Sequence, residues 1–270
     1  MAFWVGLGLT ASGASLQGLF QNPLADPYIL GVSGGASLAG CIALALGFEQ
    51  TWSLFGASFL GALAVCLILI QVTGRESIIL AGLLINAFAS SLISLIKTLL
   101  PAEGTQSLLF WLLGSFSLPE PKMLIFLGVI CLASVLFLNA KSGTIERLGL
   151  GDDEAARLGL NPSSEKRQLY LVISLLVGAI TAFCGFIGFI GLLVPQILRR
   201  FTGNNQVLLI PASALCGGLM LALFDLLSQY SHQLIGFEIP VGVITALIGT
   251  PVFGAMAYAA HRKSMRLYAR

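Results

Sequence analysis

Acidic and basic side chains, the groups best able to do chemistry, are concentrated in one short segment of this chain. Ten of its 26 charged residues lie between Lys141 and Arg167. Within "GDDEAARLG", residues 151–159, three carboxylates come first, an arginine follows and a glycine closes the run. This order matches the partial charges and the stop signal of a helix. The spacing predicts a helix of about seven residues, which is stable only when it docks on another surface.

Candidate catalytic and metal-binding groups are scattered, and they form no recognisable site. The chain has no GxxxxGK[ST] phosphate loop, so ATP hydrolysis by that route is excluded. The five cysteines all lie in apolar stretches without a CxxC pair, and we interpret them as small core side chains. The two histidines are isolated from each other. We therefore expect neither a catalytic residue nor a metal site in Cys41, Cys66, Cys131, Cys184, Cys216, His232 or His261.

A polar stripe runs along the apolar segment 78–97. Asn86, Ser90, Ser94 and Lys97 are spaced by four, four and three residues, which places them on one face of a helix. Such a face turns toward protein or water rather than lipid. Two interpretations stay open, hydrogen bonding between helices and the lining of a central channel. Thr245 and Thr250 are further candidates for the same wall.

Composition places these residues in a membrane protein. The chain is 57% hydrophobic and 10% charged, with a mean hydropathy of +0.93. Its charge-free runs mostly reach the ~20 residues that a helix needs to cross a bilayer. The sequence predicts an all-α bundle in one transmembrane domain, residues 1–270, with a cytoplasmic loop over 141–167. The expected spans are 3–20, 28–47, 52–72, 78–97, 122–139, 169–185, 187–200, 205–228 and 239–260, with 104–117 lying on or re-entering the outer face.

The basic residues orient this bundle. With the 141–167 loop inside, only Lys97 and Lys122 of the 14 basic residues fall outside, and the N-terminus also lies outside. This requires a reversal at "GFIGFIG", residues 185–191, where glycines permit a tight turn. The alternative is a close-packed helix face. Pro195 is expected to break the returning helix, and Asp225 is an intramembrane acid that is either functional or bonded to a neighbouring helix end.

Five stretches in order resemble the permease subunits of FecCD-type ABC importers, which carry iron-siderophores, haem and cobalamin. They are Gly13–Gly40, Trp111–Phe116, Leu148–Asn161, Gly188–Arg200 and Glu238–Phe253. The resemblance implies a ten-helix subunit of the cobalamin and iron-chelate permease type, in a bacterial cytoplasmic (inner) membrane. Our nine spans lack the family's first helix, which implies an internal start or a truncated chain.

The resemblance also implies roles and partners. The partners are a second permease copy or a paralogue, two cytoplasmic ATPase subunits that bind ATP and Mg, and an extracytoplasmic binding protein, while this chain binds no cofactor. The segment 148–160 would sit in a cleft of the ATPase, whose closure would switch the bundle between two states. The coupling residues would be Leu150, Gly151, Asp152, Asp153, Glu154, Ala156, Arg157, Leu158 and Gly159. The structural motif residues would be Asn22, Pro23, Asp26, Pro27, Gly188, Gly191, Pro195, Arg199, Asp225, Pro240, Gly242 and Pro251.

Three departures from the family pattern stand out. Gln21 replaces the usual arginine before "NPLADP", and Gln196 replaces the usual histidine of "VPHILR". Gln229 is the nearest match to an arginine that often faces the binding protein. We assign docking of the binding protein to Gln229 and Glu238, without the usual salt bridge.

The sequence thus favours the permease subunit of an ABC importer that moves an iron-siderophore, haem or corrinoid chelate and is driven by a separate ATPase. A secondary, ion-coupled transporter would want a paired acid and base in the membrane. A permease for free divalent metals would want histidines and carboxylates along its spans. An intramembrane enzyme would need a pair of catalytic residues on facing spans, and an inactive truncated permease is a further alternative.

Overall fold

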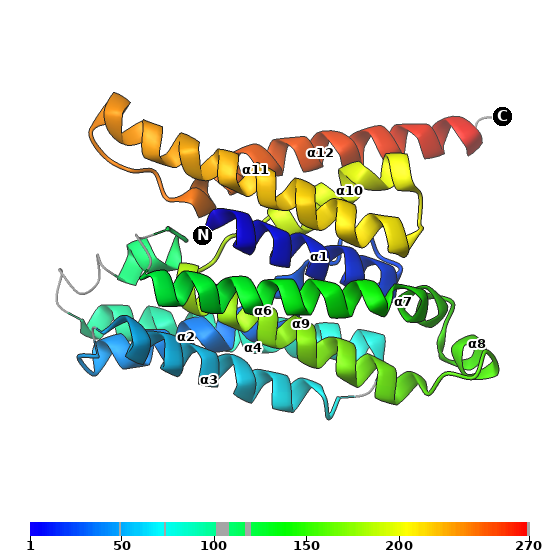
Figure 1. Ribbon diagram of the computed structural model, residues 1–270, viewed down its shortest axis with the longest axis horizontal. Coiled ribbons are helices and arrows are strands. Elements are labelled where there is room, and N and C mark those ends of the chain that lie inside the picture. The colour runs from blue at the N-terminus through cyan, green and yellow to red at the C-terminus, as the bar shows by residue number, and fades with distance from the viewer. Residues whose placement is uncertain (49, 73, 101–107, 117–119, 269–270) are drawn as a thin grey trace.

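The protein is a bundle of helices that lie roughly parallel to one long axis (Figure 1). The computed structural model describes residues 1–48, 50–72, 74–100, 108–116 and 120–268, and over these residues it contains helices and no strand. The long helices are α1 (Ala2–Phe20), α2 (Val32–Ala45), α3 (Thr51–Leu69), α4 (Arg75–Leu99), α6 (Pro121–Ala140), α9 (Pro162–Cys184), α10 (Ile190–Thr202), α11 (Gln206–Ile235) and α12 (Val241–Tyr268). A helix therefore stands at each predicted span, and the predicted all-α class is confirmed.

Shorter elements join the long ones. A 3₁₀ helix, η1 (Pro27–Leu30), precedes α2, and α7 (Ser142–Gly149) and α8 (Asp152–Arg157) fill the charged loop. Residues 108–112 are helical and lie at the end of the bundle opposite α8 (Figure 1). Of the remaining predicted outer segment, residues 113–116 are not helical, and 104–107 and 117 lie outside the described residues. By length and composition, α3, α4, α6, α9 and α11 can each cross a membrane.

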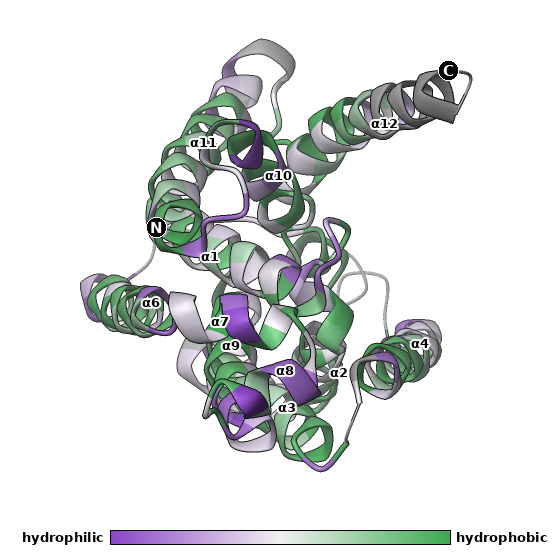
Figure 2. Cartoon of the chain, turned by 90° about the vertical axis from the view of Figure 1, so that its right-hand side faces the viewer, coloured by the Kyte–Doolittle hydropathy of each residue, from purple (hydrophilic) through white to green (hydrophobic). Residues whose placement is uncertain are grey.

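The two ends of the bundle differ in polarity as the basic residues predict. Hydrophilic residues gather on α7, α8 and the start of α9 when the α8 end faces the viewer (Figure 2). Lys141, Arg157 and Arg199 lie at this end, whereas Lys97 and Lys122 lie at the end of α4 and the start of α6, on the opposite side. We call the first side the coupling end and the other the outer end.

The reversal predicted at "GFIGFIG" is present, so the alternative of one long helix is wrong. α9 ends at Cys184, residues 185–189 are not helical, and α10 runs back toward the coupling end (Figure 1). Gly185 has a positive φ of 69°. The non-helical backbone of the turn is bonded to protein, since the N–H of Ile187 donates to the hydroxyl of Tyr28 at 3.3 Å and the N–H of Ser115 donates to the carbonyl of Cys184 at 3.1 Å. Irregular backbone at membrane depth is tolerable under this condition.

Pro195 does not break the returning helix, contrary to the sequence prediction. α10 continues through it to Thr202. Proline has no N–H to donate to the carbonyl four residues earlier, which is that of Gly191. That carbonyl faces α1 instead, so closely that a Cβ on Gly13 would lie 1.8 Å from it. The missing bond thus coincides with a close helix contact that only glycine permits.

Helix α1 lies at the centre of the bundle. All of its residues except Phe3 and Trp4 are buried. It packs most extensively along α11, and also against α6, α7 and α10. The hydroxyl of Thr10 donates to the carbonyl of Ser213 on α11 at 2.7 Å. Small residues on both helices permit this approach, which is the usual basis of helix association in membranes.

Candidate functional site

The charged loop is folded as the sequence predicts. Its short helix α8 starts after Gly151 and is followed by Gly159, and these two residues have positive φ values of 113° and 81°. Side chains with a Cβ rarely adopt this region. Asn161 then caps α9, because its Oδ1 accepts from the N–H of Ser164 at 3.2 Å, and Pro162 takes the first helical position. Two glycines and one cap therefore fix the path of the loop.

The leucines that flank α8 divide into two sets. Leu148 is fully buried and Leu160 packs against the core. Leu150 and Leu158, by contrast, are 66% and 52% exposed. Ala155 is the residue by which α8 itself enters the core. The solvent-exposed side of α8 thus presents two leucines between acidic and basic groups. We call Leu150, Leu158, Asp153 and Arg157 the α8 surface.

Ion pairs hold the loop to α9. Lys166 contacts the carboxylate of Asp152, and Lys141 pairs with Glu165 at 2.6 Å, where both side chains are partly buried. The pair between Glu154 and Arg157, at 3.1 Å, is exposed on both sides and contributes less than about 1 kcal/mol. Asp152 therefore serves the attachment of α8 to α9, whereas Asp153 is exposed and Ala156 lies on the same open side.

The predicted polar stripe of α4 lines a cavity of about 330 Å³. Asn86, Ser90, Ser94 and Lys97 all face it, and Ser33 and Ser37 of α2 stand on the opposite wall. Asn86 also bonds between elements, because its amide donates to the carbonyl of Tyr28 at 3.0 Å. Ser94 donates only to the carbonyl of Ser90 within α4. The stripe therefore combines one interhelical bond with hydroxyls that are open to the cavity.

A second, more apolar cavity of about 620 Å³ adjoins the first. Thr250 and Pro251 of α12 line it, together with Gly242. Thr245, the other predicted wall residue, is instead packed inside the protein and donates to the carbonyl of Gly242 at 2.9 Å. Leu112 and Phe186 border both cavities, so the walls of α4 and α12 meet at these two side chains.

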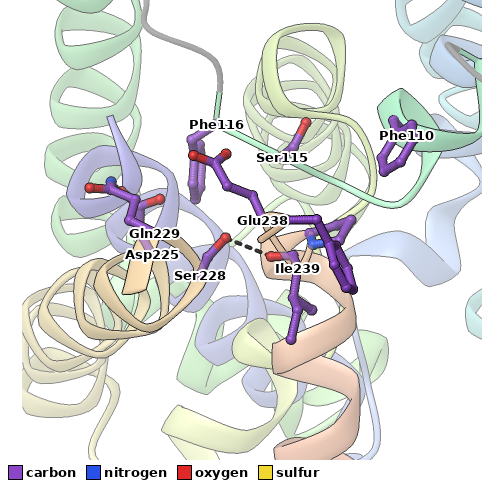
Figure 3. A pocket seen from close by; sticks show the side chains of 10 residues that line it. Phe110, Ser115, Phe116, Asp225, Ser228, Gln229, Glu238 and Ile239 are labelled. Atoms are coloured by element: carbon purple, nitrogen blue, oxygen red, sulfur yellow. Dashed lines mark hydrogen bonds between the residues drawn. The ribbon is translucent and has the colours of Figure 1, made fainter. Parts of the chain in front are cut away.

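A third cavity, of about 580 Å³, lies at the outer end (Figure 3). Asp225 and Gln229 enter it from α11, and the amide of Gln229 donates to the carboxylate of Asp225 at 3.2 Å. Glu238 reaches in from the segment before α12, which is tied to α11 by a bond from the Ser228 hydroxyl to the carbonyl of Ile239 at 2.6 Å. Pro240 and the rings of Phe110, Phe116 and Phe237 complete the wall. Asp225 is thus bonded one turn along its own helix, not to a neighbouring one.

The remaining motif residues act in turns and contacts. Asn22 accepts from the N–H of Leu24, and Asp26 accepts from the N–H of Tyr28 at 2.8 Å, which starts η1 at Pro27, while Pro23 is exposed. Burial raises the pKa of the Asp26 carboxyl to about 6, against the opposing effect of that N–H bond. Arg199 donates to Gln17 of α1 at 3.2 Å and to Asn204 at 2.8 Å. Gly188 and Gly191 lie in and beside the buried turn.

Sequence reasoning missed Phe186 and Glu146. The glycines of "GFIGFIG" indicated a turn, but nothing in the pattern showed that the ring of Phe186 would stand 44% exposed where two cavities meet. Glu146 belonged to the charged loop, yet its partner is the first N–H of α11, 60 residues along the chain. Neither contact follows from a local spacing.

Known proteins share both the sequence and the fold. The model of the FecCD transport family matches residues 1–259. The molybdate import system permease protein MolB of Haemophilus influenzae is 33% identical over 98% of this chain and 79% of its own. The vitamin B12 import system permease protein BtuC of Vibrio cholerae is 34% identical over 92% of this chain and 76% of its own.

A solved structure supports the same assignment. It is described as an inward-facing conformation of a metal-chelate type ABC transporter, and it superposes with a TM-score of 0.90 at 32% identity, over 96% of this chain and 83% of that one. The chain therefore belongs to the FecCD transport family, and it is a multi-pass permease subunit of an ABC importer in the cytoplasmic membrane, whose ATPase is a separate subunit.

Proposed function

We propose that this permease carries a bulky metal chelate, of the iron-siderophore, haem or corrinoid class, into the cell. The observation that supports it is the pair of adjoining cavities lined by Asn86, Ser90, Ser94, Lys97 and Thr250. A chelate brings its own metal ligands, so its path needs hydrogen-bonding groups rather than metal ligands. A free divalent cation would want carboxylates or imidazoles, and the described residues that line these two cavities include none.

The α8 surface is the proposed contact with the ATPase. Two ATPase subunits, one per permease copy, would press on this surface when they close around ATP. The bundle would then switch between two conformations by rigid-body movement. In the isolated subunit, Leu150 and Leu158 expose apolar side chains. Asp153 and Arg157 place charges at the rim of this apolar area. Buried apolar anchors with a polar rim are the common pattern of protein interfaces.

Reconstituted transport tests both statements. The permease, its ATPase and its binding protein are placed in proteoliposomes with a ferric siderophore, haem, a corrinoid or molybdate in turn. We expect ATP-dependent uptake of one chelate, and we expect Leu150→Asp with Leu158→Asp to lower ATPase retention during purification at least about tenfold, since each buried anchor is worth ~2 kcal/mol. Uptake of molybdate alone would contradict the chelate proposal, and full retention of the ATPase by the variant would contradict the assigned contact.

A second copy of the permease is proposed to close the path. Thr250 and Leu247 are exposed on α12, and both line the second, more apolar cavity. A pathway on a twofold axis needs the same wall from a partner, and closed symmetric dimers are the commonest assembly. Leu247, Thr250 and Pro251 would then lie between the copies.

Cysteine cross-linking measures this contact. In a Cys216→Ser background, which removes the exposed cysteine, Thr250→Cys is expected to give a covalent dimer under mild oxidation in membranes. Leu60→Cys is the matched control, because Leu60 is also exposed but lies on α3. Equal dimer yields from both variants would argue against the proposed axis.

The outer cavity is proposed as the docking site for the binding protein. Asp225 and Glu238 put two carboxylates into it, and its described lining residues include no lysine or arginine. Where relatives place an arginine, Gln229 here binds Asp225. The complementary group on the binding protein would therefore be a lysine or arginine, the reverse of the usual polarity.

Charge reversal at this site gives a direct test. Glu238→Lys is expected to slow association of the binding protein about tenfold at low salt and much less at high salt, because a charge at an interface rim acts mainly on the on-rate. Glu120→Lys, also at the outer end but outside the cavity, serves as the control. Faster association of the Glu238→Lys variant would show that the binding protein presents an acid instead.

A further inference from the structure

Helix α7 is seated on the end of α1. Its inner residues Ile145 and Leu148 are fully buried. Ile145 lies directly over Gly18, where an added Cβ would be 2.9 Å from its methyl group. An added Cβ on Gly149 would likewise meet the side chain of Gln21. α7 therefore has a fixed seat at the coupling end, between the short helix α8 and the centre of the bundle.

Glu146, on the same helix, reaches a different partner. Its Oε1 accepts from the backbone N–H of Gln206 at 2.6 Å. Gln206 is the first residue of α11 and is 2% exposed. The N–H groups at a helix start lack partners inside the helix and carry partial positive charge, so a carboxylate binds them well.

Among the described residues, the start of α11 has a second side-chain acceptor, which comes from the residue that precedes the helix. The side chain of Asn205 accepts from the N–H groups of Val207 and Leu208 at 3.0 and 3.3 Å. Asn205 caps α11 locally, whereas Glu146 ties it to α7. The two groups satisfy the same helix end, but only one of them joins two elements.

Helix α11 extends the effect of the bond between Glu146 and Gln206, which we call the joint, across the molecule. It runs beside α1 from the coupling end to the outer end (Figure 1), where Asp225 and Gln229 enter the outer cavity. α8 packs on α7 and α9. A displacement of α8 that moves α7 therefore reaches the start of α11 through the carboxylate of Glu146, and the far end of α11 carries the proposed docking site.

We propose that Glu146 is a positioning residue that couples α8 to α11, so that closure of the ATPase and occupation of the outer cavity influence each other. This rests on the proposed contact of α8 with the ATPase. The link is reciprocal, because a coupling free energy between two sites acts equally in both directions. Loss of the carboxylate leaves α7 in its seat on α1 and removes the hydrogen bond to α11, so that direct packing alone joins the two helices.

The test compares three variants in the full complex of permease, ATPase and binding protein in lipid nanodiscs. Glu146→Ala removes the joint, Glu146→Gln keeps an acceptor oxygen of the same reach without its charge, and Asn205→Ala removes the neighbouring cap without touching α7. We expect Glu146→Ala to retain the ATPase and its basal hydrolysis but to lose about tenfold in stimulation by the binding protein, within the usual range of coupling. Glu146→Gln should recover part of the loss, and Asn205→Ala should behave as wild type.

The outcomes separate this proposal from the one beneath it. Full stimulation of Glu146→Ala, or equal losses in Glu146→Ala and Asn205→Ala, would overturn the role of Glu146 while α8 stays the ATPase contact. If substitutions on the α8 surface of an otherwise wild-type complex leave ATPase binding intact, both proposals are overturned. If Glu146→Ala does not assemble, Glu146→Gln decides, because its size is unchanged: reduced stimulation supports the joint and full stimulation overturns it.

Discussion

Replacing Gly159 with valine is expected to lower uptake and the stimulation of ATP hydrolysis strongly while the bundle stays folded. Gly159 has a φ of +81° directly after α8. An L-residue pays roughly 1–2 kcal/mol in this region, and a β-branched one pays more. No side chain crowds the site, since an added Cβ would meet nothing within 4 Å. The cost therefore falls on the backbone path that aims α8, and we expect at least about a tenfold loss of uptake for a strain of this size.

A matched substitution separates backbone conformation from side-chain contact. Gly159→Asn adds a polar side chain at the same open position, but asparagine enters the left-handed region far more readily than valine. Uptake by Gly159→Asn should stay within about threefold of wild type, since its strain is a fraction of 1 kcal/mol. Equal losses in the two variants would mean that a surface contact matters here, and not the turn.

The second large effect is expected at Gly13, in the contact between α1 and α10. A Cβ at this position would lie 1.8 Å from the carbonyl oxygen of Gly191 and 2.6 Å from its carbon. Both atoms are backbone, so no rotamer change can relieve the clash, and the helices must separate. Overpacking of a core typically costs about 1–3 kcal/mol, and a backbone clash lies at or above the top of that range. Gly13→Val should therefore fail to accumulate in membranes or should lose its thermal unfolding transition in detergent.

Gly56 provides the comparison. It is also a glycine inside a membrane helix, α3, but an added Cβ there would meet nothing within 4 Å. Gly56→Ala should leave the unfolding temperature unchanged or raise it slightly, because alanine favours a helix over glycine by about 1 kcal/mol. A Gly13→Val protein as stable as the Gly56→Ala protein would show that α1 and α10 do not pack as described.

Local signals in the sequence predict local structure well. Gly151, Gly159 and Asn161 bound their helices where expected, because turn and cap chemistry acts within a few residues. The charge count required a reversal, because the basic residues had to share one side, and the glycines placed it within residues 185–191, where the structure has it at 185–189. The prediction for Pro195 was wrong because the cost of a proline depends on what the freed carbonyl faces. Here the carbonyl of Gly191 faces Gly13 of α1.

Contacts between distant segments could not be predicted in this way. The period of α4 grouped Asn86, Ser90 and Ser94 correctly on one face, but it could not show that Ser33 and Ser37 would stand opposite. It also could not separate Thr245, which is buried, from Thr250, which lines a cavity. These facts depend on how helices cross, and a single sequence carries no signal for that.

The central position of α1 has a consequence for biosynthesis. Its main partner is α11, and the bond from Thr10 to Ser213 joins residues that leave the ribosome far apart in time. At about 5–20 residues per second, roughly 10–40 s pass before α11 is made. Through that interval the hydroxyl of Thr10 has no carbonyl of Ser213 to donate to, and the face of α1 that packs along α11 lacks its partner. The helix at the centre of the finished bundle therefore gains its main partner only after α11 has been synthesised.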